Sequence, residues 1–165
     1  MKIKELHRDD VKVFLELTDQ VEREAAYMLM EPGERKSGHQ LEKVKAFIND
    51  PHSTILIAEA ENQWIGYALA FGGKANRNQH TISIVLGVIQ DFQGKGAGSS
   101  LLNSLEEWAR ERGIHRIELT TVVKNTAAVH LYKKNGYEIE GCKRDSLKMN
   151  NTYVDEYYMA KLLWG

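Results

Sequence analysis

The 165-residue sequence has one cysteine, two prolines and no long uninterrupted hydrophobic run. A single cysteine, Cys142, excludes an internal disulfide and a cysteine-rich zinc site. No segment approaches the roughly 18 uncharged residues of a membrane-spanning helix, and the first ten residues lack the apolar core of a signal peptide. We therefore expect a cytoplasmic protein without a metal centre and without a membrane partner.

An excess of charge of one sign is also absent. The 22 Lys and Arg residues nearly balance the 23 Asp and Glu residues, so the formal net charge is -1. This balance gives no reason to expect nucleic acid as a partner. The 42% hydrophobic and 27% charged residues are typical of a soluble globular protein. The length predicts one domain over residues 1–165, and the sequence leaves a homodimer open.

The chain is organised around a glycine-rich stretch between a strand and a helix. Apolar residues alternate from Ile82 to Ile89, which indicates a strand, and residues from Leu101 to Ala109 have the apolar spacing of an amphipathic helix. Glycines between them allow a sharp turn and a close approach of a ligand to the backbone. Because the first turn of a helix has unpaired N–H groups, such a turn can bind phosphate. A flexible turn without a ligand is the plainer interpretation.

The glycine spacing does not fit the common nucleotide motifs. A P-loop needs a Lys-Ser or Lys-Thr pair that is missing here, and the third glycine of a dinucleotide fingerprint is replaced by Ser99. The stretch does match Q-x-x-G-x-G, and here the chain resembles the GCN5-related N-acetyltransferase (GNAT) family, in which this loop holds the pyrophosphate of acetyl-CoA. The resemblance implies cofactor contacts from Val88, Gln93, Gly94, Lys95, Gly96, Ala97, Gly98 and Ser99.

A second stretch, from Asn125 to Tyr137, resembles the N-x-x-A-x-x-L-Y-x-x-x-G-[FY] segment of the same family. The resemblance implies that Asn125 and Ala128 contact the cofactor and that Tyr132 is the catalytic acid that protonates the CoA sulfur. A phenol with a reference pKa of about 10 is protonated at neutral pH and able to donate. From the residues alone, Asn125 is equally a helix N-cap and Tyr132 a core aromatic residue.

The pattern along the chain indicates an α+β fold with a mixed, mostly antiparallel sheet of six to seven strands and flanking helices. We expect strands at residues 2–7, 54–59, 64–71, 82–89, 117–123, 137–142 and 152–162. Helices are expected at residues 11–21, 37–48, 98–112 and 125–135. The strands at 82–89 and 117–123 should be parallel because a helix connects them. The resemblance, which covers residues 54–163, implies the acyl-CoA N-acyltransferase fold, in which this central pair splays apart.

The resemblance implies an N-acetyltransferase that uses acetyl-CoA as co-substrate and no metal. It would move the acetyl group directly, in a ternary complex, to the primary amine of a small amine, a polyamine or a protein N-terminus. A backbone N–H near Val88 could polarise the thioester oxygen. A longer acyl donor stays open, because the loop contacts only the pyrophosphate. The alternative is a non-catalytic CoA-binding regulatory or scaffold protein, because many relatives carry a glutamate on the fourth strand and residues 81–89 contain no carboxylate.

The general base and the acceptor site are the least defined parts of the sequence. Glu31 and Glu34 flank a Pro-Gly turn beside apolar residues, and they could bind an ammonium group or could pair with nearby basic side chains on the surface. Asp155 and Glu156 add two carboxylates in the last strand. The candidate bases are Glu31, Glu34, Glu59, His80 and Asp91.

Three lysines and one cysteine complete the candidates. Lys95, Lys133 and Lys134 could meet the phosphates of the cofactor, although lysines on helices are usually only solvated. Cys142 could carry an acyl group, but a lone cysteine on a strand is expected to be buried and inert. We therefore expect transfer without an acyl-cysteine.

Overall fold

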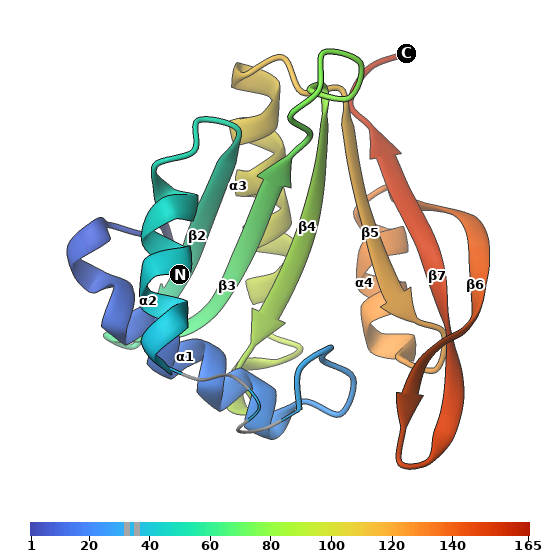
Figure 1. The fold of residues 1–165 in the computed structure, drawn as a ribbon, viewed down its shortest axis with the longest axis horizontal. Helices are drawn as coiled ribbons and strands as arrows, with labels where there is room; N and C mark the ends of the chain where they lie inside the picture. Colours follow the sequence, from blue (N-terminus) through green and yellow to red (C-terminus); the bar gives the residue numbers. More distant parts are fainter. Residues whose placement is uncertain (32–33, 35–36) are drawn as a thin grey trace.

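The structure, a computed structural model, describes residues 1–31, 34 and 37–165. Its centre is one seven-stranded sheet with the order β1-β2-β3-β4-β5-β7-β6 (Figure 1). Only β4 and β5 are parallel neighbours in the described chain, and the other neighbours are antiparallel. The strands are β1 (Lys2–Glu5), β2 (Ser53–Ala60), β3 (Gln63–Gly72), β4 (Thr81–Val88), β5 (Arg116–Val122), β6 (Glu138–Met149) and β7 (Thr152–Leu162). The expected α+β fold is confirmed.

Helices cover both faces of this sheet. α1 (Val11–Glu24) and α2 (Ser37–Ile48) lie on one face, while α3 (Ala97–Glu111) and α4 (Thr126–Lys134) lie on the other (Figure 1). Two short 3₁₀ turns, η1 (Arg8–Asp10) and η2 (Gln90–Phe92), precede α1 and α3. Edge-to-face contacts of Phe14 with Tyr67 and of Phe47 with Phe71 fix α1 and α2 on β3.

The apolar residues that recur at regular spacing in the sequence form the core of the structure. α3 buries Leu101, Leu102, Leu105, Trp108 and Ala109, which share one face at helical spacing. Removing these side chains from water is the main favourable contribution to packing α3 on the sheet. The glycine-rich turn at the start of α3 is therefore held on a well-packed support.

The parallel pair separates along its length. β4 and β5 are paired only at Thr81–Arg116, Ile82–Ile117 and Ser83–Glu118, although both strands continue beyond this point. Figure 1 shows the two strands diverging toward the ends that lead into α3 and α4. The expected splay is confirmed, and unpaired edges of β4 and β5 face each other inside the sheet.

Two local predictions were wrong. β6 runs from Glu138 to Met149, well beyond the expected end at residue 142. A register shift between Lys143 and Leu147, with Asp145 at φ 50°, interrupts the alternation that would have revealed a long strand. Cys142 is exposed on β6, because β6 is an edge strand.

None of the helices within the described ranges has the length and hydropathy needed to span a membrane.

Candidate active site

The turn between β4 and α3 presents open backbone donors. Gly94 and Gly96 have φ values of 74° and 91°, a region that L side chains rarely adopt. Within the described chain, the backbone N–H groups of Gly94, Lys95 and Gly96 donate no hydrogen bond. The side-chain amide of Gln93 donates to the carbonyl of Val88 at 3.1 Å, which closes the turn. These exposed N–H groups at the positive end of α3 suit the pyrophosphate of acetyl-CoA.

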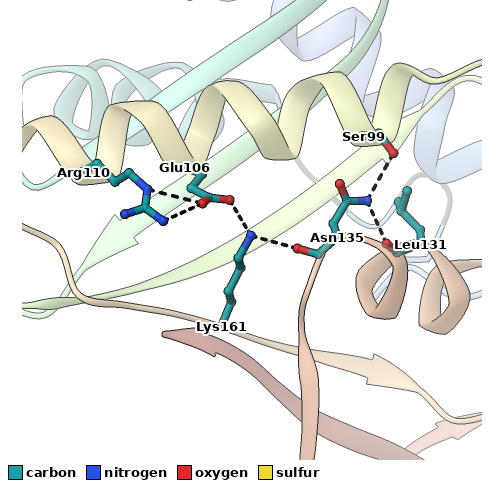
Figure 2. A network of polar contacts seen from close by, with 6 residues as sticks. All are labelled: Ser99, Glu106, Arg110, Leu131, Asn135 and Lys161. Carbon is teal, nitrogen blue, oxygen red and sulfur yellow. Dashed lines mark hydrogen bonds and ion pairs between the residues drawn. The ribbon is translucent and has the colours of Figure 1, made fainter. Parts of the chain in front are cut away.

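The first turn of α3 is tied to α4. A Cβ added at Gly98 would lie 2.7 Å from the Leu131 side chain, so glycine allows the two helices to approach closely. The Asn135 side chain, just after α4, donates to the Ser99 hydroxyl at 3.1 Å and to the Leu131 carbonyl at 2.8 Å (Figure 2). The turn expected to bind the pyrophosphate and the helix that carries Tyr132 are therefore held as one unit.

Tyr132 lies in α4, and its ring packs edge-on against Tyr137 with centroids 5.6 Å apart. Only 7% of Tyr132 is exposed, and burial raises the pKa of its hydroxyl to about 12. Its hydroxyl makes no hydrogen bond to a described residue, and the side chain lines the cavity described below. The phenol thus stays protonated at neutral pH and is available as a proton donor, the chemistry expected for it.

Asn125 and Val88 flank the separated strands. The Asn125 side chain accepts from the Ala128 N–H at 3.3 Å and caps α4, and both residues line the cavity. The Ile89 N–H donates to Ile65 of β3 at 2.9 Å. Because successive N–H groups of a strand alternate in direction, the Val88 N–H points away from β3 and toward the space between β4 and β5. This donor has the direction that a thioester oxygen between the strands would need.

A cavity of about 790 Å³ occupies the splay and continues under α1 and α2. One wall is mostly apolar and comes from α1, α2 and β3. The other comes from β5, β6 and β7 and carries charged and hydroxyl side chains beside apolar ones. The polar lining residues of β5, β6 and β7 are Arg116, Glu118, Thr120, Thr121, Lys143, Ser146, Glu156 and Tyr158. The mostly apolar wall includes Phe14, Leu15, Met28, Phe47, Leu69 and Phe71, together with the polar Thr18, Gln40 and Lys43.

The candidate bases named from the sequence do not line this cavity. Glu31 and Glu34 are exposed, and the Glu34 carboxylate accepts from the Glu31 N–H at 3.3 Å. The turn predicted at residues 32–33 lies outside the described residues. Glu59 pairs with Lys4 at 3.3 Å, and His80 and Asp91 are exposed.

The described carboxylates that line the cavity are Glu118 and Glu156. Glu118 accepts from Arg116 Nε at 2.8 Å and from the Ser83 hydroxyl at 3.4 Å. Glu156 accepts from the Ser146 hydroxyl. Neither was a candidate base from the sequence, although Glu156 was noted. The available signal was that Glu156 and Tyr158 are two residues apart in one strand, so that both side chains lie on the same face of the sheet.

The lysines proposed for phosphate contacts differ in their surroundings. Lys95 is exposed in the glycine turn, with its ammonium 5.3 Å from the centre of the Phe92 ring. Lys133 and Lys134 are exposed in the last turn of α4. Across residues 1–31, 34 and 37–165, no three His, Cys, Asp or Glu side chains gather as a metal site would require.

Comparisons with known proteins agree with this geometry. The model of the family described as Acetyltransferase (GNAT) family matches residues 18–137. The L-amino acid N-acetyltransferase AaaT of Escherichia coli (strain K12) is 32% identical over 111 residues, which are 65% of this chain and 67% of that relative.

Solved structures share the fold over nearly the whole chain. An acetyltransferase of the GNAT family from Streptococcus pneumoniae has a TM-score of 0.89 and 25% identity, and covers 98% of each chain. The protein yncA from Salmonella typhimurium, solved with its cofactor acetyl-CoA, has a TM-score of 0.85 and 19% identity, over 100% of this chain and 95% of that one. The chain belongs to the GNAT family and is an acetyl-CoA-dependent N-acetyltransferase.

Proposed function

We propose that this acetyltransferase moves the acetyl group directly from acetyl-CoA to the primary amine of a small acceptor, with both substrates bound at once. The observation that carries the proposal is the continuous cavity in the splay of β4 and β5. It is lined on one side by Asn125, Ala128 and Tyr132, which match the cofactor side of the family, and on the other by side chains of β5, β6 and β7 that we assign to the acceptor. The cavity volume of about 790 Å³ is in the range of small-molecule sites.

Each group has a defined part in the transfer. The N–H groups from Gly94 to Ser99 bind the pyrophosphate, and the Val88 N–H polarises the thioester oxygen. The amine nitrogen attacks the carbonyl carbon, so that a C–N bond forms and the C–S bond breaks. The sulfur leaves with the bonding electron pair and takes the proton of the Tyr132 hydroxyl. Water then returns a proton to Tyr132.

Two observations support a small acceptor rather than a protein N-terminus or a scaffold role. The Escherichia coli relative is named an L-amino acid N-acetyltransferase. The missing carboxylate on β4 was the reason to consider a non-catalytic CoA-binding protein, and Glu118 and Glu156 bring carboxylates to the cavity from β5 and β7.

The test is a CoA-release assay with acetyl-CoA and a panel of acceptors: L-leucine, L-leucinamide, spermidine and an alanine-terminated peptide. We expect acceptor-dependent release with a small amine. Tyr132→Phe should lower kcat about a hundredfold, a usual value for loss of a general acid, with calorimetric acetyl-CoA affinity unchanged. Tight acetyl-CoA binding without release from any acceptor would instead establish the non-catalytic alternative.

A further inference from the structure

Two charged side chains of the cavity, Lys143 on β6 and Glu156 on β7, are direct partners in the antiparallel pair. Side chains at such positions lie on the same face, with Cβ atoms about 5 Å apart. Neither forms an ion pair with a described residue, and Lys143 is exposed. A cation and an anion thus stand side by side in the cavity without neutralising each other.

The other charged groups of the cavity wall differ. Arg116 donates to Glu118 at 2.8 Å and to both carboxylate oxygens of Glu140 at 2.9 and 2.6 Å. Hydrogen bonds from Arg116 hold the pKa of the Glu140 carboxyl below its usual range. Lys43 from α2 lines the cavity as well. The charges of Arg116 and Glu118 are therefore already compensated, which leaves Lys43, Lys143 and Glu156. Of these three, Lys143 and Glu156 are opposed strand positions of opposite charge.

An irregularity in β6 holds Glu156 in place. The register of β6 and β7 shifts between Lys143 and Leu147, and Asp145 has φ 50°. The Asp145 N–H donates to the Asp155 carboxylate at 2.7 Å, and the Ser146 hydroxyl donates to Glu156. Bulges next to active sites often redirect a side chain. This one brings the Ser146 hydroxyl and Leu147 into the cavity wall beside Glu156.

We propose that Glu156 and Lys143 bind the ammonium and the carboxylate of a free α-amino acid, and that Glu156 takes the ammonium proton before attack. A free α-amino acid carries both charges on one carbon, which matches two opposite charges on opposed strand positions. The apolar wall of Phe14, Phe47 and Leu69 suits an apolar side chain on that amino acid. The inference rests on the proposed function and names its acceptor.

Glu156 lies where a base is needed. It pairs with Val122, the last residue of β5, beyond the point where β4 and β5 separate, and the cavity it lines also contains Tyr132. The Glu156 carboxylate accepts one proton from the ammonium, which leaves a neutral nitrogen with a lone pair. That nitrogen attacks the thioester carbon as described above, its second proton is lost to water, and water also receives the Glu156 proton. The net products are the N-acetyl amino acid, CoA and one proton.

Lys143→Gln tests recognition of the acceptor carboxylate. We expect KM for L-leucine to rise about tenfold or more, the usual effect of losing a hydrogen bond to a charged group. KM for L-leucinamide, which lacks the carboxylate, should stay within twofold of the wild-type value. Lys148→Gln, an exposed lysine of β6 outside the cavity wall, is the matched control and should change neither. An equal effect of Lys143→Gln on both acceptors would overturn the role of Lys143.

Glu156→Gln tests the proton transfer. The variant should lose about a hundredfold in kcat with L-leucine near neutral pH. Below the pKa of the amine, the fraction of neutral amine rises about tenfold per pH unit, so its kcat/KM should recover as pH rises. Glu156→Asp should retain part of the activity, and Glu138→Gln, an exposed carboxylate of β6 outside the cavity wall, should be unchanged.

The outcomes separate this inference from the proposed function. Wild-type turnover with L-leucine that Glu156→Gln leaves unchanged overturns the inference alone. Loss of activity in Glu156→Gln without recovery at higher pH overturns the proton transfer. Acetyl-CoA binding by the wild type without turnover of any acceptor overturns the proposed function itself. Circular dichroism of each variant confirms that the compared proteins are folded.

Discussion

Tyr132, the proposed proton donor, also makes the stability of the fold depend on pH. Burial raises the pKa of its hydroxyl from 10.0 to about 12. The folded state therefore favours the protonated phenol more than the unfolded chain does. This contribution to stability is complete below pH 10.0 and is lost as pH rises to about 12.

We predict that the free energy of unfolding falls between pH 10 and pH 12 more in the wild type than in Tyr132→Phe. A shift of two pKa units corresponds to about 2–3 kcal/mol. Burial also raises the pKa of Tyr137, so part of the decline should remain in the variant. Guanidinium denaturation across this pH range measures the difference, and identical curves for the two proteins would refute burial of an unpaired phenol.

The sequence predicted the local structure of the glycine turn and the Asn125 cap, whereas the carboxylates selected for the acceptor do not line the cavity, for a physical reason. Asn125 and the glycines act through local backbone geometry, a cap and a turn, which short motifs encode. Glu31 and Glu34 were selected because they are neighbours along the chain. The charged wall is instead formed by strand pairing between residues distant in sequence, such as Lys143 with Glu156. That register depends on a bulge that no local pattern indicated.

At the level of elements, the start of α3 and its end offer a matched pair of glycines. Gly96 precedes α3 with φ 91° and Gly113 follows it with φ 70°, and a Cβ at either position would meet nothing within 4 Å. Alanine should therefore cost each site about 1–2 kcal/mol of left-handed strain and little else in the free protein.

We predict that Gly96→Ala and Gly113→Ala lower the unfolding midpoint similarly, whereas only Gly96→Ala weakens acetyl-CoA binding. The added methyl group at Gly96 would stand in the open space beside the N–H groups of the turn. Calorimetry with acetyl-CoA and thermal denaturation on the same samples make the comparison. Equal affinities of the two variants would mean that the turn is merely flexible.

A second element-level feature joins α3, the end of α4 and β7. The Lys161 ammonium donates to Glu106 of α3 at 2.7 Å and to the Asn135 carbonyl at 2.9 Å (Figure 2). Burial alone would raise the pKa of the Glu106 carboxyl, but hydrogen bonds from Lys161 and Arg110 outweigh it, and the pKa is lowered. The pair therefore stabilises the fold above the usual pKa range of a glutamate, and this stabilisation is lost as pH falls through the lowered pKa.

Lys161→Met should reduce stability at neutral pH by about 1–2 kcal/mol, because it leaves a half-buried carboxylate with one partner fewer. The melting temperature should fall by about 2–8 °C for a protein of this size. The deficit should shrink in acid, where Glu106 is protonated in both proteins. Lys148→Met, an exposed lysine of β6, is the control with no expected shift. A deficit independent of pH would contradict the assigned ion pair.

At the scale of the molecule, the candidate site depends on one feature of the sheet, the separation of β4 and β5. The strand-helix-strand order and the hairpins were readable from apolar periods, and with them most of the topology. The splay was implied only by family resemblance, because an interrupted ladder has no signature in the sequence of either strand. The structure has three paired positions between β4 and β5 before they separate. The resulting cavity has a volume of about 790 Å³, and exposed Cys142 is not among its lining residues.

Direct transfer within this cavity is the central claim, and initial-rate kinetics test it most directly. The rate of CoA release is measured against acetyl-CoA concentration at several fixed concentrations of L-leucine, in the wild type and in Cys142→Ser. We predict intersecting lines in double-reciprocal plots and the same rates in both proteins, because both substrates must be bound before the acetyl group moves. Parallel lines together with loss of turnover in Cys142→Ser would show an acetyl-enzyme intermediate and contradict the account.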